Sequence, residues 1–282
     1  MTTITVRRGR QLRPGAIIVG VLITAMSILW LVPVYLAFVN ASIPLQSYTG
    51  KPQWTTTEFG FFDNVVRGWE AGNFTATGYN SIVYSLVSAT ASVAISTIAA
   101  FALVVMPVKR PKMWFWIIYA GTLLPLQAFA IPMYQASIAL NLYDTQPALI
   151  IVYTAICIPF GFFLVRNFMA TLPPELSQAA KLDGAGWWRM FWSIYVPLVR
   201  PAMAAAFVFQ FIAIWNELFF AVTLAISSET QPVMAALAGM QAKGSLVGQP
   251  ATLAMAIVIS LPTVAVFFIF QRYFKSGLTA NL

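Results

Sequence analysis

Long apolar segments alternate with shorter polar ones along the whole chain. Six of the apolar segments reach about 20 residues, the length that a helix needs to cross the hydrocarbon core of a bilayer. Few charged residues interrupt them, and a sustained apolar run of this kind is typical of a transmembrane helix. They lie at about 15–38, 81–105, 114–136, 147–167, 201–226 and 251–271. The pattern predicts an all-α membrane protein, with six transmembrane helices in a single domain that covers residues 1–282.

Two of these segments carry local signals of their own. The third contains Pro125 and Pro132, and proline inside a helix removes a backbone donor and kinks or breaks the helix. The second is rich in Ser, Ala and Thr, and small side chains let transmembrane helices approach closely. We therefore expect a kinked or broken third segment and close helix packing around the second.

The polar stretch between the first two segments, residues 40–80, contains one further helical pattern. Apolar and aromatic residues recur there at the spacing of a helix face. They are Phe61, Phe62, Val65, Val66 and Trp69. The pattern predicts a short amphipathic helix that lies at the membrane surface. A helix that binds a partner protein is the alternative.

The composition agrees with a membrane protein and excludes several site chemistries. Charged residues make up 9% of the chain, against about 25% in soluble domains. Histidine is absent and Cys157 is the only cysteine, which excludes internal disulfides, zinc sites built from His or Cys, and His-dependent catalytic triads. The phosphate-binding pattern GxxxxGK[ST] is also absent. We therefore predict that the chain is not an enzyme and itself binds neither a metal nor a cofactor.

The basic residues are distributed unevenly between the two sides of the six predicted helices. With the N-terminus placed inside, the inner residues are Arg7, Arg8, Arg10, Arg13, Lys109, Arg110, Lys112, Arg166, Lys181, Arg189, Arg200, Arg272 and Lys275. The outer ones are Lys51, Arg67 and Lys243. This asymmetry follows the positive-inside rule. It predicts a multi-pass protein with both termini in the cytoplasm, and it accounts for the net charge of +8 without a nucleic-acid partner.

The longest polar interruption in the second half of the chain is residues 171–197. Its prolines suit the first turn of a helix, and Glu175 would lie near the positive end of that helix dipole. Gly184 stands where a helix C-terminus favours a left-handed residue. A second helix is expected from about Ala185, with Pro197 at its end or at a kink. The stretch is therefore predicted to be two short helices joined at a glycine, on the cytoplasmic side.

The spacing within this stretch resembles the "EAA" signature of permease subunits of bacterial ABC importers. That signature reads Glu-Ala-Ala, three residues, Gly, nine residues, then Ile-x-Leu-Pro. Here Gln178-Ala179-Ala180 is followed after three residues by Gly184, within Asp183-Gly184-Ala185, and nine residues later by Ile194-Tyr195-Val196-Pro197. Gln178 stands in place of the family's Glu, and Val196 in place of its Leu. The chain is most similar to the carbohydrate-type, maltose-like branch of the family.

The resemblance implies a function and a set of partners. In this family the loop docks into a groove on a cytoplasmic ATPase, which implies an ATPase-coupling loop formed by Glu175, Gln178, Ala179, Ala180, Asp183, Gly184, Ile194 and Pro197. The implied assembly lies in the bacterial inner membrane among lipids. It contains a second permease subunit, two ABC ATPase subunits that bind ATP and Mg, and an external solute-binding protein. The implied solute is a sugar or a sugar derivative.

Further motifs along the chain look like the same family. They are Asn80-Ser81, Pro159-Phe160, Trp215-Asn216-Glu217, Gln271-Arg272-Tyr273-Phe274 and Gly277-Leu278-Thr279. The family usually continues with a tail similar to Gly-Ala-Val-Lys-Gly that contacts the ATPase, whereas this sequence reads Ala280-Asn281-Leu282. The sequence therefore gives no support to a tail contact of that kind. The outer loop 227–250 either reaches into the binding protein, as the resemblance suggests, or is a solvated connector.

Glu217 is the only carboxylate deep within a predicted transmembrane helix. A charge there costs about 3 kcal/mol on insertion scales, so the side chain should face the bundle interior or water. Two interpretations stay open. Glu217 lines the path of the solute together with Trp215 and Asn216, or it belongs to a buried network with Asn216 or with a serine of a neighbouring helix. A different class of function also stays open: a stand-alone, ion-coupled secondary transporter with Glu217 as its coupling site.

Overall fold

The computed structural model describes residues 14–242 and 247–279, and every regular element within them is helical. The long helices are α1 (Pro14–Ala41), α3 (Phe74–Val105), α6 (Gln146–Met169), α9 (Val196–Trp215) and α12 (Gln249–Thr279). The short elements are η1 (Leu45–Ser47), α2 (Phe61–Ala71), α4 (Pro111–Ala120), η2 (Leu126–Phe129), α5 (Ala130–Ala139), α7 (Glu175–Leu182), α8 (Trp187–Met190), the π-helical turn η3 (Phe191–Tyr195), α10 (Phe219–Leu224) and α11 (Val233–Ala242). Five helical stretches in the described residues are long and apolar enough to cross a membrane.

The segment predicted at 114–136 is not a single helix. It forms α4, the 3₁₀ turn η2 and α5, and the two α-helices have 10 residues each. The break falls at Pro125, whose backbone is extended at φ −66° and ψ 124°. Pro132 lies in the first turn of α5, where its missing N–H leaves no hydrogen bond unmade. The expectation of a break is therefore confirmed, and the segment has no helix long enough to count among the five.

The predicted segment 201–226 is also interrupted. The helix α9 begins earlier than predicted, at Val196, and ends at Trp215. Asn216 is its C-terminal cap, and a new helix, α10, begins at Phe219. The prediction of one continuous helix through Glu217 was therefore wrong. The carboxylate binds the first free amides of α10, as described below, and so stabilises the start of a second helix.

The small residues of α3 pack against α6 and α9, as predicted. Ser88 and Ser96 donate hydrogen bonds to the carbonyl oxygens of Ile150 and Ile158 on α6, at 3.2 and 3.0 Å. A Cβ on Gly161 would lie 2.2 Å from Nε2 of Gln210 on α9 and 2.8 Å from Oγ of Ser96 on α3. The three helices therefore meet closely at this level, and a larger residue than glycine on α6 would displace the side chain of Gln210 or Ser96.

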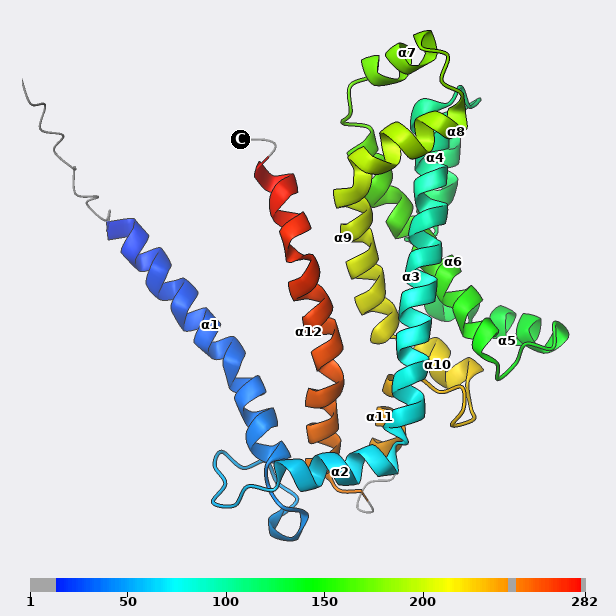
Figure 1. Ribbon diagram of the computed structural model, residues 1–282. Helices are drawn as coiled ribbons and strands as arrows, with labels where there is room; N and C mark the ends of the chain where they lie inside the picture. Colours follow the sequence, from blue (N-terminus) through cyan, green and yellow to red (C-terminus); the bar gives the residue numbers. More distant parts are fainter. Residues whose placement is uncertain (1–13, 243–246, 280–282) are drawn as a thin grey trace, which may run out of the picture.

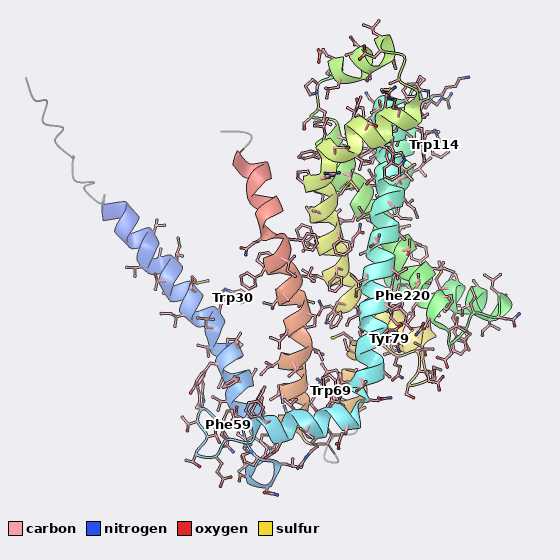
Figure 2. The ribbon with its side chains drawn as sticks, viewed as in Figure 1. Trp30, Phe59, Trp69, Tyr79, Trp114 and Phe220 are labelled. Carbon is pink, nitrogen blue, oxygen red and sulfur yellow. The ribbon has the colours of Figure 1, made fainter. Side chains whose placement is uncertain are left out.

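The two ends of the molecule differ in the elements that they carry (Figure 1). The pair α7 and α8 lies at one end, the beginning of α1 and the end of α12 point toward that end, and α2 crosses the opposite end. Tryptophan is present at both ends, Trp114 near α8 and Trp69 on α2 (Figure 2). Most of α1 leans away from the bundle, and none of its apolar window is buried, although its last turn is buried and the helix contacts α12.

The predicted short helix in 40–80 is confirmed as α2. It buries Asn64 and Gly68 and packs against α12 and α3. The side-chain amide of Asn64 donates to the carbonyl oxygens of Ala41 and Ile43, at 2.9 and 2.8 Å, which fixes the end of α1. Phe62 and Val66 remain exposed on the other side of α2. The helix thus links α1 to the bundle while it leaves an apolar face uncovered.

Candidate functional site

The glycine between α7 and α8 closes α7 by a Schellman motif. Gly184 has a left-handed φ of +73°. Its N–H donates to the carbonyl of Lys181 at 3.0 Å, and the N–H of Ala185 donates to the carbonyl of Ala180 at 2.9 Å. These are the paired bonds by which such a motif satisfies the last carbonyls of a helix. The predicted role of Gly184 as the turn between two helices is confirmed.

The helix α7 is attached to the bundle by one face only. Ala180 is 5% exposed and packs with Met190, Phe191 and Tyr195 in the core cluster at this end. The other residues predicted for the coupling loop on α7 and its cap are exposed: Glu175, Gln178, Ala179, Asp183 and Gly184. Leu182 is 90% exposed. The two alanines of the motif thus differ, since one packs inside and the other belongs to the outer surface.

The second helix begins at Trp187, two residues later than expected, and does not end at Pro197. It continues through the π-helical turn η3 into α9, and the ribbon changes direction between α8 and α9 (Figure 1). A proline in a regular helix collides with the carbonyl four residues earlier, and a wider π turn relieves that collision. Of the two interpretations for Pro197, the kink is therefore confirmed and the helix end is wrong. Ile194 is half-buried beside this turn and Pro197 is exposed.

Both carboxylate oxygens of Glu217 accept hydrogen bonds from other groups of the chain. The amide of Phe220 donates to both carboxylate oxygens, at 3.0 and 3.1 Å, and the amide of Ala221 donates to Oε2 at 3.2 Å. The Tyr153 hydroxyl on α6 donates to Oε2 at 2.9 Å. Carboxylates are favoured at a helix N-terminus because its first amides are free. The buried network that the sequence suggested thus exists, but with Tyr153 and backbone amides as its members.

The two neighbours of Glu217 point to different surroundings. Trp215 is 4% exposed, and its Nε1–H donates to the carbonyl of Ile259 on α12 at 2.9 Å. Asn216 is exposed and donates to the carbonyl of Ile212 at 2.8 Å. Of the three residues predicted for the solute path, only Asn216 therefore offers its side chain to an open surface. The other two join α9 to α6, α10 and α12.

A hydrogen-bond network around Asp144 holds the segment after α10 in place. Oδ1 of Asp144 accepts from the amides of Ile226 and Ser227 at 2.9 and 3.1 Å, and from the Thr230 hydroxyl at 2.5 Å. Burial raises the pKa of Asp144, but these hydrogen bonds outweigh that effect, and the pKa lies below its ordinary value of 3.8. The network is therefore formed with the ionised carboxylate at neutral pH.

Asn80, near the start of α3, extends this network. Its side-chain amide donates to the carbonyls of Glu229 and Gln231 at 2.7 and 3.2 Å, and its oxygen accepts from Nε2 of Gln146 at 2.8 Å. The Tyr84 hydroxyl donates to the carbonyl of Thr230 at 2.7 Å. Sequence analysis missed this cluster because its members lie 66 to 151 positions apart.

The segment 227–250 is therefore not a solvated connector over its first part. The helix α11 buries Val233, Leu237 and Met240 in the core cluster of this end. The amide of Val233 donates to the Ser81 hydroxyl on α3 at 2.8 Å. Residues 243–246, with Lys243, lie outside the described residues, as do the basic residues of 1–13 and the ending 280–282.

The sequence matches the model of one known protein family. Residues 92–279, well over half of the chain, match the family model described as "Binding-protein-dependent transport system inner membrane component". The chain belongs to this family. The match extends from the middle of α3 to the end of α12 and so contains α7, α8, the Glu217 cap and the Asp144 network. The resemblance drawn from the sequence is confirmed.

Members of the family with curated names cover most of the chain. A probable ABC transporter permease protein, y4oR, of Sinorhizobium fredii is 38% identical over 212 residues, which cover 73% of this chain and 75% of that protein. The sn-glycerol-3-phosphate transport system permease protein UgpE of Yersinia enterocolitica is 31% identical over 277 residues, which cover 93% of both chains. Both names describe permease proteins of transport systems.

A solved structure shares the fold. It is described as a bacterial ABC transporter involved in the import of the acidic polysaccharide alginate. The TM-score is 0.76 at 23% sequence identity, and the match covers 96% of this chain and 100% of that chain. At this identity the likeness supports the arrangement of helices and not the choice of solute.

Proposed function

We propose that the chain crosses the bacterial inner membrane six times, with the α7 end in the cytoplasm. Both α3 and α6 lead toward that end, so the chain between them must lead away from it, and α4, η2 and α5 supply this third crossing (Figure 1). Lys109 and Arg110 lie in the connection between α3 and α4, and Lys112 lies in the first turn of α4, near Trp114 at the α7 end (Figure 2). Basic residues at this end favour the cytoplasmic assignment.

Within that membrane the protein serves as a permease subunit of an ATP-driven importer. It passes a sugar or a sugar derivative from an external binding protein to the cytoplasm. A second permease and two ABC ATPase subunits, which hold ATP and Mg, complete the assembly. The observation that carries this proposal is α7, a short helix that is closed at Gly184, packs on the bundle along the face that holds Ala180 and exposes Gln178 and Ala179, in a chain of the binding-protein-dependent family.

The contacts behind α7 suggest how movement of an ATPase would reach the membrane helices. Lys181 places its Nζ 4.8 Å from the centre of the Trp187 ring on α8. Phe101 on α3 packs edge-on against Phe191 and Tyr195, with ring centres 5.3 and 5.2 Å apart. A displacement of α7 is therefore carried to α8, α9 and α3 as one body. Such coupling drives import only if the ATP-bound ATPase binds one state of the bundle more tightly than the other.

Two glycines of the same loop allow a matched test of this coupling. Gly184 has φ +73°, whereas Gly186 has an extended backbone at φ −70° and ψ 164° with open space around its Cβ position. Gly184→Val should abolish uptake in a protein that still reaches the membrane, because a β-branched residue is strongly disfavoured at positive φ. Gly186→Val should import normally. Normal uptake by Gly184→Val would refute the proposed coupling role.

A further inference from the structure

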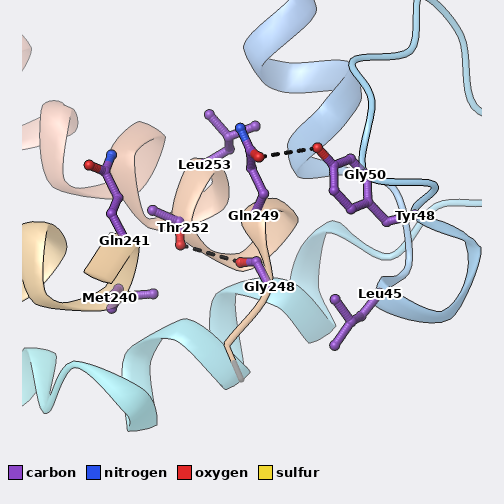
Figure 3. Close-up of a pocket in the computed structure, with 9 residues that line it drawn as sticks. All are labelled: Leu45, Tyr48, Gly50, Met240, Gln241, Gly248, Gln249, Thr252 and Leu253. Atoms are coloured by element: carbon purple, nitrogen blue, oxygen red, sulfur yellow. Dashed lines mark hydrogen bonds between the residues drawn. The ribbon is translucent and has the colours of Figure 1, made fainter. Parts of the chain in front are cut away.

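A hollow of about 590 Å³ lies at the end opposite α7, between the segment 45–50, the end of α11 and the start of α12 (Figure 3). Its volume lies within the range of roughly 300–1,000 Å³ that is usual for small-molecule sites. One wall of the hollow is formed where the segment 45–50 packs closely against the start of α12. A Cβ on Gly248, whose φ is +86°, would lie 2.3 Å from Cδ1 of Leu45. Glycine at this position thus lets the segment 45–50 pack directly onto the start of α12.

The hollow combines an apolar floor with neutral polar groups at its rim. Met240 and Thr252 are buried in the floor. Tyr48 and Gln249 face each other across the rim, and the Tyr48 hydroxyl donates to Oε1 of Gln249 at 3.2 Å (Figure 3). Among the described residues, nothing accepts a hydrogen bond from Nε2 of Gln249 or from the amide of Gln241. The two amides can thus both donate to a ligand and accept from it, and the Tyr48 oxygen can accept.

We propose that this hollow is an outer subsite for an uncharged, polyhydroxylated solute. Sugar hydroxyls both donate and accept hydrogen bonds, as the rim amides do, and the CH faces of a sugar ring match the apolar floor. No charged side chain is part of the lining that the described residues form. A charged group in the hollow would lose hydration without gaining an ion pair, which is unfavourable. The inference rests on the proposed function, since it names the class of solute that the importer receives.

Saturation-transfer NMR on the purified chain in lipid nanodiscs tests the subsite with two matched disaccharides. Trehalose is neutral, and trehalose 6-phosphate differs from it only by a phosphate. We expect signals from the trehalose ring protons and signals at least about fivefold weaker from the phosphate ester, the ratio for one lost hydrogen bond of about 1 kcal/mol. Equal signals from the two sugars, or none from trehalose, would overturn the proposal.

Substitutions at the rim of the hollow test whether trehalose binds there. Gln249→Leu and Gln241→Leu change exposed rim residues and should each reduce the trehalose signal about fivefold, because each removes hydrogen bonds to the sugar. Tyr79→Leu changes an exposed tyrosine on α3 that is not part of the lining and should leave the signal unchanged. A trehalose signal of wild-type strength in both glutamine variants would show that the sugar binds elsewhere and would contradict the proposal.

Two lysines adjoin the lining residues in the sequence, Lys51 after Gly50 and Lys243 two positions after Gln241. Lys51→Gln and Lys243→Gln should leave the preference for trehalose unchanged. A preference that is present in the wild type but lost in either variant would assign the selectivity to the lysines and contradict the proposal. The proposed importer function is tested separately by the subunits that co-purify with the chain, so either conclusion can fail while the other stands.

Discussion

The Tyr153 hydroxyl on α6 lies 2.9 Å from Oε2 of Glu217, the residue between α9 and α10. The same carboxylate receives the first free amides of α10. A carboxylate in this position stabilises the start of a helix and joins it to α6. An ion-coupled carrier would need the carboxylate to bind and release its ion during transport, which would break these contacts in every cycle. The geometry therefore favours a structural role for Glu217.

The substitution Glu217→Gln separates the two roles. Glutamine keeps one acceptor oxygen and carries an NH₂ group in place of the other, which would face the donating amide of Phe220, so we expect a loss of about 1–3 kcal/mol of stability. Thermal unfolding of the purified variant measures this loss. Any uptake that the variant retains should still depend on ATP and not on an ion gradient. Unchanged stability together with loss of ion-driven uptake would instead identify a secondary carrier.

The Asp144 network predicts a pH dependence of stability. Because the pKa of Asp144 lies below 3.8 in the folded chain, the carboxylate contributes stability that is fully present well above pH 3.8 and is lost as the pH falls through the folded pKa. Asp144→Asn tolerates the positive φ of 56° at this position but carries no charge. The difference in Tm between the wild type and Asp144→Asn should be constant between about pH 5 and 7 and shrink below about pH 4. A difference that does not vary with pH would contradict the assigned role.

The close packing at Gly161 predicts a large effect for a small substitution. Gly161→Ala would place a methyl group 2.2 Å from Gln210 Nε2, so the Gln210 amide must shift and strain its hydrogen bond to the Cys157 carbonyl, at a cost of about 1–3 kcal/mol. Gly78→Ala in α3 is the control, because its Cβ would meet nothing within 4 Å. The control should be neutral or slightly stabilising, since alanine favours helices by up to about 1 kcal/mol over glycine. Equal unfolding temperatures for the two variants would show that α6 is less tightly held than described.

The two alanines of α7 predict opposite outcomes for the same substitution. Ala180→Leu should lower the Tm of the purified chain, since Ala180 is 5% exposed and packs in the core cluster. Ala179→Leu lies on the exposed surface and should leave the Tm unchanged. We expect it to reduce retention of the ATPase at least about tenfold, the ratio for a loss of about 1.4 kcal/mol of binding energy. Wild-type retention in Ala179→Leu would show that this face does not meet the ATPase.

Features set by local sequence were predictable. Gly184 required a left-handed turn, the apolar spacing of α2 required a helix, and Pro125 broke the third apolar segment. Each of these depends on a few neighbouring residues and on backbone sterics. The assignment of the coupling-loop residues, which rests on the spacing of one motif, stays a prediction. The π turn before Pro197 was not predicted, because proline alone does not tell a kink from a helix end.

Features set by distant contacts were not predictable. Asp144 is an ordinary loop residue in the sequence, and its partners at Ile226 and Ser227 lie 82 and 83 positions away. The interruption of the predicted 201–226 helix is different, because the Glu217 cap of α10 is a local feature, with amides three and four residues later, that the apolar pattern alone did not reveal. The hollow beside Tyr48 joins segments about 200 positions apart, since Gln249 lies 201 positions from Tyr48. Such sites become visible only when the chain is folded.

The most direct test of the account is purification of this chain from its native membrane in a mild detergent, with mass spectrometry of the proteins that accompany it. The account predicts that an ABC ATPase and a second permease co-purify, and that the ATPase is reduced when the bait carries Ala179→Leu. It also predicts that ATP hydrolysis by the complex rises when the external binding protein is added. A chain that is recovered alone, under conditions that preserve other membrane complexes, would contradict the assignment as an importer permease.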